Sequence, residues 1–527
     1  MILEPWHWYG GSEKNSVRWP IERSQISLSA FVTGEGFQDQ WGNVQERYWL
    51  CNAGLAITIP QDIPLHVSVN EQNSGQLVFL AKRRNTLYEN FGDDKKLKLE
   101  YSLWIANGKT SLRELHLYVA NHWFKKPLGV PAKELFFDPI WTTWAEYHVD
   151  VNQEKVINFS KNITKHGFSC CQIELDDRWA THHGDLEFDP KKFPDPTQMI
   201  ENLAAPITFW VHPFVNLDAT VLNSKETPSD IWVKQAGSED PLVVDWWNGK
   251  GRVIDLTNQK AAVWFGQRLQ CFREKFKISS FKFDAGEVVF FGSNFKLFNS
   301  SYPNIFTEAY AQFAAEFGNR IEVRCGSKTT ELPVFVRIFD KFSHWGPDNG
   351  LASLIPAILT MGLIGYPFIL PDIIGGNAYG DVHPDKELYI RWLQASTFCP
   401  CLQFSIPPWR YDSEVIEIAK KFTYLHKSLS GLLFSLAKSA VNTGLPIIRP
   451  LWFVDEESEK AWTCDSEYLV GEDILVAPIL KQGATSRTVF IPKGRWESQL
   501  DFKISSGPVE VIQNADLSQL PWFKRVV

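Results

Sequence analysis

The feature that most constrains the fold is an alternation of short apolar runs with longer amphipathic stretches over residues 129–432. This pattern is typical of βα units, in which crossover helices join parallel strands. The candidate strands are 137–145, 168–176, 206–214, 242–247, 279–286, 320–326, 334–340, 366–372 and 398–404. The candidate helices are 154–167, 261–277, 306–318, 351–362, 387–397 and 413–429.

Roughly eight βα units over some 300 residues predict an α/β fold of the (β/α)₈ TIM-barrel type. A doubly wound open sheet is the alternative architecture. It usually carries a Gly-rich phosphate loop after its first strand, and none follows residues 137–145 here. The barrel is therefore the better prediction.

Both flanks of this region have the pattern of β-structure. Residues 1–128 contain alternating runs at 26–32, 55–59, 65–69 and 115–120, separated by Gly, Asn and Asp turns. We expect an N-terminal β-sandwich there. In residues 433–527, the runs at 468–480 and 486–496 read as strand pairs of a C-terminal β-domain. The predicted domains are thus 1–128, 129–432 and 433–527.

Composition and charge exclude several classes of function. The formal charge is −8 and there is no basic run, so nucleic acid is not an expected partner. No stretch reaches the ~18 apolar residues of a membrane-spanning helix, and the first residues lack the pattern of a signal peptide. The 8 cysteines have no metal-ligand spacing, so neither a metal nor another cofactor is expected. The oligomeric state is left open.

Aromatic residues are abundant, with 22 Trp and 37 Phe. Most are expected in the core, but some Trp stand beside acids, as in Asp245-Trp246-Trp247 and Asp177-Arg178-Trp179. Aromatic faces stack on the apolar face of a sugar, and carboxylates bind its hydroxyls. The pairing favours a carbohydrate substrate.

Four acids close candidate barrel strands: Asp176, Asp284, Asp340 and Asp372. Such an Asp can simply cap the next helix. In a barrel enzyme, however, the carboxyl ends of the strands carry the active site. Two carboxylates in one pocket suit glycoside hydrolysis, in which one attacks or stabilises the anomeric carbon and the other protonates the leaving oxygen.

Ordered motifs then make the chain resemble glycoside hydrolase family 31. They are PIWTTWA (139–145), LDDRW (175–179), GDLEFDPKKFPDP (184–196), WVHPF (210–214), DWWNGKG (245–251), FKFDAGE (281–287), ELPVFVR (331–337), SHWGPDNGL (343–351), GYPFILPDIIGGN (365–377) and ELYIRWLQ (387–394). The motifs RPLWF (449–453), GEDILVAPIL (471–480) and IPKGRW (491–496) resemble the β-domain that follows the family's barrel.

The resemblance implies that Asp284 is the catalytic nucleophile. Glu287, three residues later, could be taken for the second carboxylate, but its loop offers no proton path, so we expect it at the rim or behind the site. For the acid/base it implies Asp340, which stands 16 residues after Arg324 and five before Trp345, as in the family. The other candidate, Asp348, fits neither spacing, and we expect it to cap a helix starting near residues 349–350.

The resemblance also implies substrate-binding residues. Asp176 would bind sugar hydroxyls, Arg324 would bind a ring hydroxyl and lower the pKa of nearby carboxylates, and Trp247 would form a wall of the pocket. Trp345 and Asp372 would either touch the sugar or brace the site. Residues 34–43 of the N-terminal domain are expected to reach the pocket.

One departure bears on the sugar. Many α-glucosidases of the family carry a His after the eighth strand, where this chain reads LQFSIPPW (402–409). This agrees instead with an animal branch of the family, which implies a preference for terminal α-galactosyl residues and a location in the secretory pathway. The prediction is a retaining exo-α-glycosidase that prefers α-galactosides. The alternatives are an α-glucosidase, a sulfoquinovosidase or a catalytically silent glycan-binding protein.

Overall fold

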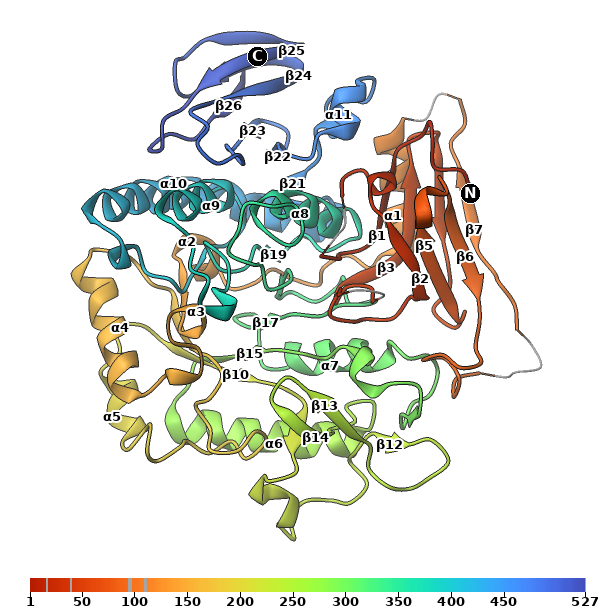
Figure 1. Ribbon diagram of the computed structural model, residues 1–527, viewed down its shortest axis with the longest axis vertical. Helices are drawn as coiled ribbons and strands as arrows, with labels where there is room; N and C mark the ends of the chain where they lie inside the picture. The colour runs from red at the N-terminus through yellow and green to blue at the C-terminus, as the bar shows by residue number, and fades with distance from the viewer. Residues whose placement is uncertain (16–17, 38–39, 93–96, 109–110, 527) are drawn as a thin grey trace.

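The centre of the molecule is a parallel β-barrel (Figure 1). The computed structural model describes residues 1–526 except 16–17, 38–39, 93–96 and 109–110. Eight strands follow one another as β20-β8-β9-β10-β15-β17-β18-β19. Their bounds are β8 (Ile140–Thr142), β9 (Gln172–Leu175), β10 (Ile207–Val211), β15 (Ser280–Phe283), β17 (Glu322–Val323), β18 (Phe335–Arg337), β19 (Ile369–Leu370) and β20 (Gln403–Phe404).

The barrel is closed between its last two strands. A parallel bridge joins Ile373, just after β19, to Gln403 of β20, and the Ile374 amide donates to the Gln403 carbonyl at 3.0 Å. Because the paired strands are parallel, their carboxyl ends meet at one rim. The fold predicted from the sequence is confirmed.

All six candidate helices are present. They are α4 (Gln153–Lys165), α6 (Gln259–Phe276), α7 (Ile305–Ala315), α8 (Leu354–Leu363), α9 (Lys386–Ser396) and α10 (Ser413–Thr443). In α4, Val156, Phe159 and Ile163 share the buried face at helical spacing, and Asn152 caps the first turn by accepting from the Lys155 amide. The last helix continues well past residue 432, the expected end of the barrel.

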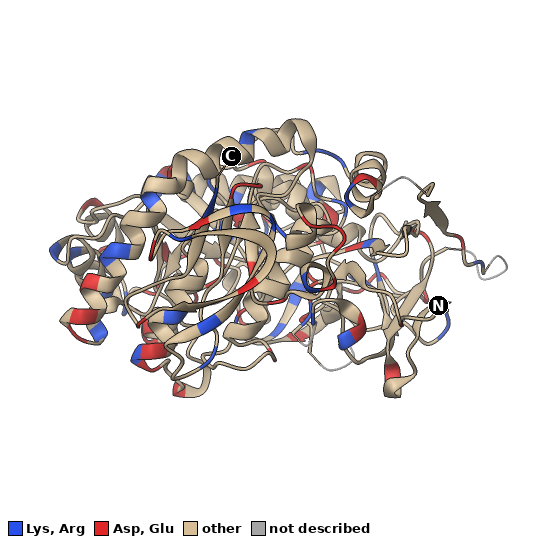
Figure 2. Ribbon diagram, turned by 90° about the horizontal axis from the view of Figure 1, so that it is seen from above, with Lys and Arg blue, Asp and Glu red and all other residues tan. Residues whose placement is uncertain are grey.

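The short helices of the chain are α2 (Glu134–Phe137), α3 (Trp144–Tyr147), α5 (Pro196–Glu201) and α11 (Glu459–Thr463). Acidic and basic residues are interspersed along the outer helices (Figure 2). Among the described residues, no helix is both long and apolar enough to cross a membrane.

The N-terminal domain consists of two antiparallel sheets, β1-β3-β4-β7 and β2-β5-β6. Their strands are β1 (Trp8–Ser12), β2 (Ile26–Ala30), β3 (Gln45–Cys51), β4 (Leu55–Thr58), β5 (Leu65–Val69), β6 (Leu77–Ala81) and β7 (Ser102–Ile105). Trp49, Ile57 and Val67 belong to the apolar core shared by the two sheets.

The strand predicted at 115–120 is wrong, because these residues lie in helix α1 (Leu112–Trp123). Ser111 and Glu114 form a reciprocal capping box at its start, and Leu112, Leu115 and Val119 form its buried face. The short run LHLYVA fits either period. The capping box of Ser111 and Glu114 favours the helix.

Residues 242–247 were also wrongly predicted, as a barrel strand. They contain β13 (Val243–Trp246), which pairs with β14 (Gly249–Val253) in a tight hairpin, and β14 pairs in turn with β11 (Phe214–Asn216). A barrel strand needs a crossover helix to its neighbour. Here the chain instead turns back at Trp247-Asn248, and Gly249 (φ 111°) follows as the first residue of β14. A second small sheet joins β12 (Lys234–Gln235) to β16 (Phe295–Lys296).

The C-terminal domain is one antiparallel sheet in the order β21-β22-β23-β26-β24-β25. The strands are β21 (Ile448–Arg449), β22 (Tyr468–Val470), β23 (Ile474–Val476), β24 (Ser486–Ser498), β25 (Ile504–Asn514) and β26 (Trp522–Val526). Helix α8 is buried along its whole length and packs against both β1 and β21. It therefore joins all three domains.

The N-terminal domain is fastened to the barrel next to the active-site rim. Gly326, just after β17, exchanges backbone hydrogen bonds of 3.0 Å with Asn43 and Gln45. Nearby, the buried Glu46 accepts from the Tyr366 hydroxyl at 2.9 Å and from the Lys328 amide at 2.6 Å. Burial raises the pKa of Glu46 from 4.5 to about 8, so this interface holds a neutral carboxylic acid at pH 7.

This proton makes the stability of the interface depend on pH. Above pH 4.5 the unfolded chain releases the proton that folded Glu46 keeps up to about pH 8. Stability from this group therefore falls as pH rises through that window. Glutamine has no proton to lose. As pH rises, we therefore expect the free energy of unfolding of Glu46→Gln to increase relative to wild type by up to about 1.4 kcal/mol per pH unit. Urea unfolding at pH 5, 6.5 and 8 measures the difference. The exposed Glu89→Gln is the control, and a pH-independent difference for Glu46→Gln would contradict this account.

Candidate active site

A pocket of about 630 Å³ opens at the carboxyl ends of the barrel strands. This volume is in the range of sites for small ligands. Its walls combine barrel loops with two outside elements, namely Glu35 and Phe37 of the N-terminal domain and Trp247 of the β13–β14 hairpin. The other main lining residues are Trp144, His148, Asp176, Asp177, Arg178, Trp210, Asn248, Lys282, Asp284, Arg324, Arg337, Phe339, Asp340, Phe342, Asp372, Asn377, Tyr379 and Asp381.

Asp284 follows β15 directly and lies at the bottom of the pocket. Its Oδ2 accepts from the indole N–H of Trp210 at 2.8 Å. Its Oδ1 lies 3.3 Å from Arg324 Nε and 3.3 Å from Arg337 Nη2. Burial alone would raise the pKa of Asp284, but the two guanidinium groups outweigh burial and lower it below its usual value. Asp284 is therefore ionised at neutral pH.

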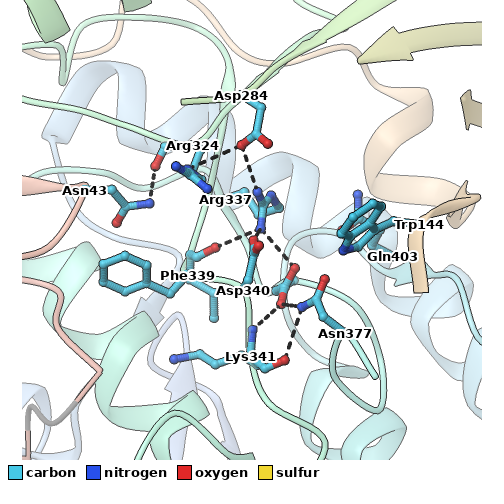
Figure 3. A network of polar contacts seen from close by, with 12 residues as sticks. Asn43, Trp144, Asp284, Arg324, Arg337, Phe339, Asp340, Lys341, Asn377 and Gln403 are labelled. Carbon is cyan, nitrogen blue, oxygen red and sulfur yellow. Dashed lines mark hydrogen bonds and ion pairs between the residues drawn. The ribbon is translucent and has the colours of Figure 1, made fainter. Parts of the chain in front are cut away.

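The guanidinium of Arg337 joins three acids from three strand ends, Asp284, Asp340 and Asp372, which we call the acid trio (Figure 3). While Nη2 faces Asp284, Nη1 donates to Asp340 Oδ1 and to Asp372 Oδ1, the latter at 3.2 Å. Arg337 Nε lies 3.5 Å from Glu322, deeper in the barrel. The two acids predicted to be catalytic thus bind different nitrogens of one side chain.

Asp340 is held at both carboxylate oxygens. Its Oδ1 binds Arg337 and its Oδ2 accepts from the Tyr379 hydroxyl at 2.5 Å. Burial opposes ionisation, but Arg337, Arg324 and the Tyr379 hydrogen bond bring the pKa of Asp340 well below its usual range. Asp340 is therefore a carboxylate at neutral pH.

Asp372 differs from its two partners in the acid trio. Its Oδ2 accepts from the Lys341 amide and from Asn377 Nδ2, both at 2.7 Å. Burial raises its pKa to about 6 despite Arg337. Asp372 has a left-handed backbone, with φ 63°. Strained geometry of this kind is frequent at functional sites.

Arg324 links the acid trio to the outer wall. It donates to the buried Glu287 at 2.7 Å, and its guanidinium carbon lies 4.9 Å from the centre of a ring of Trp247. The Trp247 side chain is 41% exposed at the pocket mouth. Glu35 lies 3.9 Å from Arg324, and burial raises the pKa of Glu35 to about 7.

Asp176 enters the pocket from β9 beside a buried ionic cluster inside the barrel. Lys282 Nζ lies 3.0 Å from Asp176, 3.5 Å from Glu322 and 3.6 Å from Glu174. Burial, followed by the neighbouring Glu174, raises the pKa of Glu322 to about 8. Lys282 is therefore a cation surrounded by acids beside the acid trio.

The structure places most of the predicted residues together. Those that line the pocket are Asp176, Trp247, Asp284, Arg324, Asp340 and Asp372. Trp345 is half-buried and is not part of the pocket lining. Glu287 is fully buried behind Arg324 and so lies behind the site, not at its rim. Glu35 and Phe37 bear out the expectation that residues 34–43 reach the pocket, although 38–39 lie outside the described residues.

The capping role predicted for Asp348 is wrong. Its carboxylate is 73% exposed and pairs with Arg18 of the N-terminal domain at 2.5 Å. The helical turn that follows has Gly350 at its N-cap and no side-chain cap. Asp348 thus pairs with Arg18 of another domain and does not cap the local helical turn.

Sequence reasoning missed Arg337, Lys282 and Tyr379. Arg337 and Lys282 lie inside the runs VFVRIFD and FKFDAG, in which a cation between apolar residues was itself a signal of an inward-facing charge. Tyr379 had no such signal. Among the described residues, no group of three or more His, Cys, Asp or Glu is arranged to hold a metal ion.

Comparison with protein-family models assigns all three parts of the chain. Residues 138–436 match the family 31 glycosyl hydrolase TIM-barrel domain and residues 444–526 its C-terminal domain. Residues 2–105 match the N-terminal domain of myogenesis-regulating glycosidase. The chain belongs to glycoside hydrolase family 31. Membership places it among the glycosyl hydrolases, whose substrates are carbohydrates.

Sequence similarity to known proteins extends over most of the chain. It is 38% identical to mouse myogenesis-regulating glycosidase over 98% of its own length and 74% of that protein. The SITS-binding protein of Tetronarce californica is 26% identical over 92% of this chain and 69% of its own. The Escherichia coli sulfoquinovosidase is 25% identical over 60% of this chain and 49% of its own.

A solved family 31 dextranase of Flavobacterium johnsoniae, in complex with glucose, has the same fold. It superposes with a TM-score of 0.81 at 19% identity, over 99% of this chain and 66% of that chain.

Arg337 is predicted to stabilise the fold most strongly when the acid trio is ionised. Without this cation, burial raises the pKa values of the three acids, so the stability of Arg337→Met falls as pH rises. We expect a loss of about 3–5 kcal/mol at pH 7 that shrinks toward pH 4.5. Guanidinium unfolding at both pH values measures it. The surface variant Lys427→Met should lose under about 1 kcal/mol, and an equal loss for Arg337→Met at both pH values would refute the prediction.

Proposed function

We propose that the protein is a retaining exo-α-glycosidase that removes terminal α-linked sugars, preferentially α-galactosyl residues. Asp284 is the nucleophile and Asp340 the acid/base. The observation that carries the proposal is the pair of carboxylates, from two strand ends, on different nitrogens of the Arg337 guanidinium in a single pocket. One sugar bound there would reach both acids. Retaining enzymes need their two carboxyl groups ~5 Å apart.

The reaction takes two displacements. Asp284 attacks the anomeric carbon and forms an ester, while the bond to the leaving oxygen breaks and that oxygen takes its electron pair and a proton from Asp340. In the second step water attacks the same carbon and gives a proton to Asp340, and Asp284 leaves as a carboxylate. Two inversions restore the α configuration. No cofactor takes part.

The charged side chains around Asp284 suit its role as the nucleophile. Arg324 and Arg337 keep Asp284 ionised and would also stabilise it as the leaving group of the second step. Asp176, 3.0 Å from Lys282, faces the pocket as an acceptor for sugar hydroxyls. Trp247 supplies an apolar face for stacking at the mouth.

The same charges oppose the acid role of Asp340 at neutral pH. Its low pKa leaves little of the protonated form that the first step requires. This form grows as pH falls. We therefore expect kcat/KM to rise as pH is lowered from 7 toward 5, as measured with an α-glycoside that has an unactivated alcohol as leaving group. A rate that rises continuously from pH 5 to 8 would contradict this assignment of the acid.

The preference for galactose follows the resemblance to the animal branch, and the 38% identity to mouse myogenesis-regulating glycosidase supports it. An α-glucosidase activity is the nearest alternative, since relatives include the α-glucosidase 2 of Bacillus thermoamyloliquefaciens. A sulfoquinovosidase would need a cation for the sulfonate. The inner cations Lys282, Arg324 and Arg337 are all paired with carboxylates, which favours a neutral sugar.

A substrate panel with two variants tests the proposal. We expect wild type to hydrolyse aryl α-galactoside faster than aryl α-glucoside and to release the α-anomer first, as seen by proton NMR. Asp284→Asn should lose about 10⁴-fold or more in kcat, because no nucleophile remains.

Asp348→Asn is the matched control, because it changes a nearby acid that pairs with Arg18 outside the pocket. It should keep wild-type activity. Undiminished turnover by Asp284→Asn would disprove the assignment. Calorimetric sugar binding by a wild type that hydrolyses nothing would favour the silent glycan-binding protein instead.

A further inference from the structure

Tyr379 contacts Asp340 from the loop after β19, two residues beyond the motif GYPFILPDIIGGN. The loop joins β19 to α9, and the Tyr379 hydroxyl donates to Asp340 Oδ2 at 2.5 Å. Because Arg337 already binds Oδ1, both oxygens of Asp340 have a donor. The phenol therefore binds the carboxylate oxygen that Arg337 does not bind.

The loop that carries Tyr379 is hydrogen-bonded to the acid trio. Asn377 donates to Asp372 Oδ2 at 2.7 Å, and the Ala378 amide donates to Ser343 Oγ at 3.0 Å. Ala378 and Asp381, on either side of Tyr379, have φ values of 51° and 59°. Non-glycine residues in this region cost about 1–2 kcal/mol each. Such a conformation persists only where its surroundings enforce it, and here they place the phenol on Asp340.

A second hydrogen bond orients the phenol. Trp144, on α3, donates from its indole N–H to the Tyr379 oxygen at 3.3 Å. The oxygen accepts this bond, so its own hydrogen is free to point at Asp340. Burial, together with the neighbouring Asp340, keeps the pKa of Tyr379 well above its usual value. The phenol therefore stays protonated and acts as a donor toward Asp340.

We propose that Tyr379 is a positioning residue for the acid/base: it holds Asp340 Oδ2 toward the leaving-group side of the pocket and supports the ionised form that activates water. This inference rests on the proposed function. During the first step, Asp340 passes its own proton to the leaving oxygen, and Tyr379 then donates to the carboxylate that results. The Tyr379 O–H bond does not break in either step.

The roles of the two donors differ. Arg337 is shared among the acid trio and sets its charge, whereas Tyr379 binds only Asp340 within that trio. Other groups also act on the charge of Asp340. The titratable and charged side chains around it include Arg337, Arg324, Asp284, Asp372, Glu35 and Tyr379. The ring of His148 stacks on that of Tyr379. Removing the phenol oxygen alone leaves these other groups in place.

Tyr379→Phe keeps the ring and removes only this donor. Because the lost bond favoured the ionised form, the carboxyl becomes easier to protonate. We expect the basic limb of the kcat/KM profile to move up by about one pH unit. We also expect kcat to fall by about tenfold, since water activation loses its oriented base. Trp144→Phe should shift the profile in the same direction by less.

The control is Tyr411→Phe, which removes a phenol that donates to the Pro384 carbonyl, away from the acid trio. Its profile should match that of wild type. If Tyr379→Phe, with an unchanged melting temperature, also has the kcat and pH profile of wild type, the proposal is overturned.

A second readout does not need turnover. Difference infrared spectra report the protonated carboxyl band of Asp340, assigned by its loss in Asp340→Asn. The band should titrate at higher pH in Tyr379→Phe than in wild type, and an identical midpoint would refute the link. If wild type hydrolyses no α-glycoside but the midpoint still moves, the proposed function fails while the coupling of Tyr379 to Asp340 stands.

Discussion

The pocket depends on one buried cation among acids. Charges taken out of water are costly unless they are paired, and breaking such a group by removing one partner costs about 3–5 kcal/mol. Arg337 lets Asp284, Asp340 and Asp372 share a single floor. Its position follows from the parallel barrel, which brings the ends of β15, β18 and β19 to one rim. The geometry of the acids is therefore a property of the whole barrel.

The outer domains complete this floor. The N-terminal domain is fastened at Gly326, two residues after Arg324, and so brings Glu35 and Phe37 to the pocket. The β13–β14 hairpin brings Trp247 against the guanidinium of Arg324. Segments far apart in the chain thus meet around one arginine. Changes in the N-terminal domain are expected to reach the chemistry through this contact.

Sequence periodicity predicted the barrel well, because each βα unit has its own local pattern. It failed where a short run fits two periods, as at 115–120, or where a turn redirects a strand, as at 242–247. Barrel geometry pointed to a set of strand-end acids that includes Asp284 and Asp340, and the family resemblance then implied their roles. Arg337 and Tyr379 were not found, because Arg337 also binds Asp372 and Asp284, and Tyr379 binds Asp340, across 35 or more residues of sequence. Such pairings have no local signature.

The central claim is that Asp284 becomes covalently bound to the sugar while Asp340 protonates the leaving oxygen of the same glycosidic bond. A 5-fluoro-α-galactosyl fluoride tests it most directly, because the fluorine slows hydrolysis of the glycosyl-enzyme more than it slows its formation. Mass spectrometry of the intact protein and of its peptides should show one added sugar, bound as an ester to Asp284. No adduct in a turnover-competent protein, or an adduct on another residue, would contradict this account.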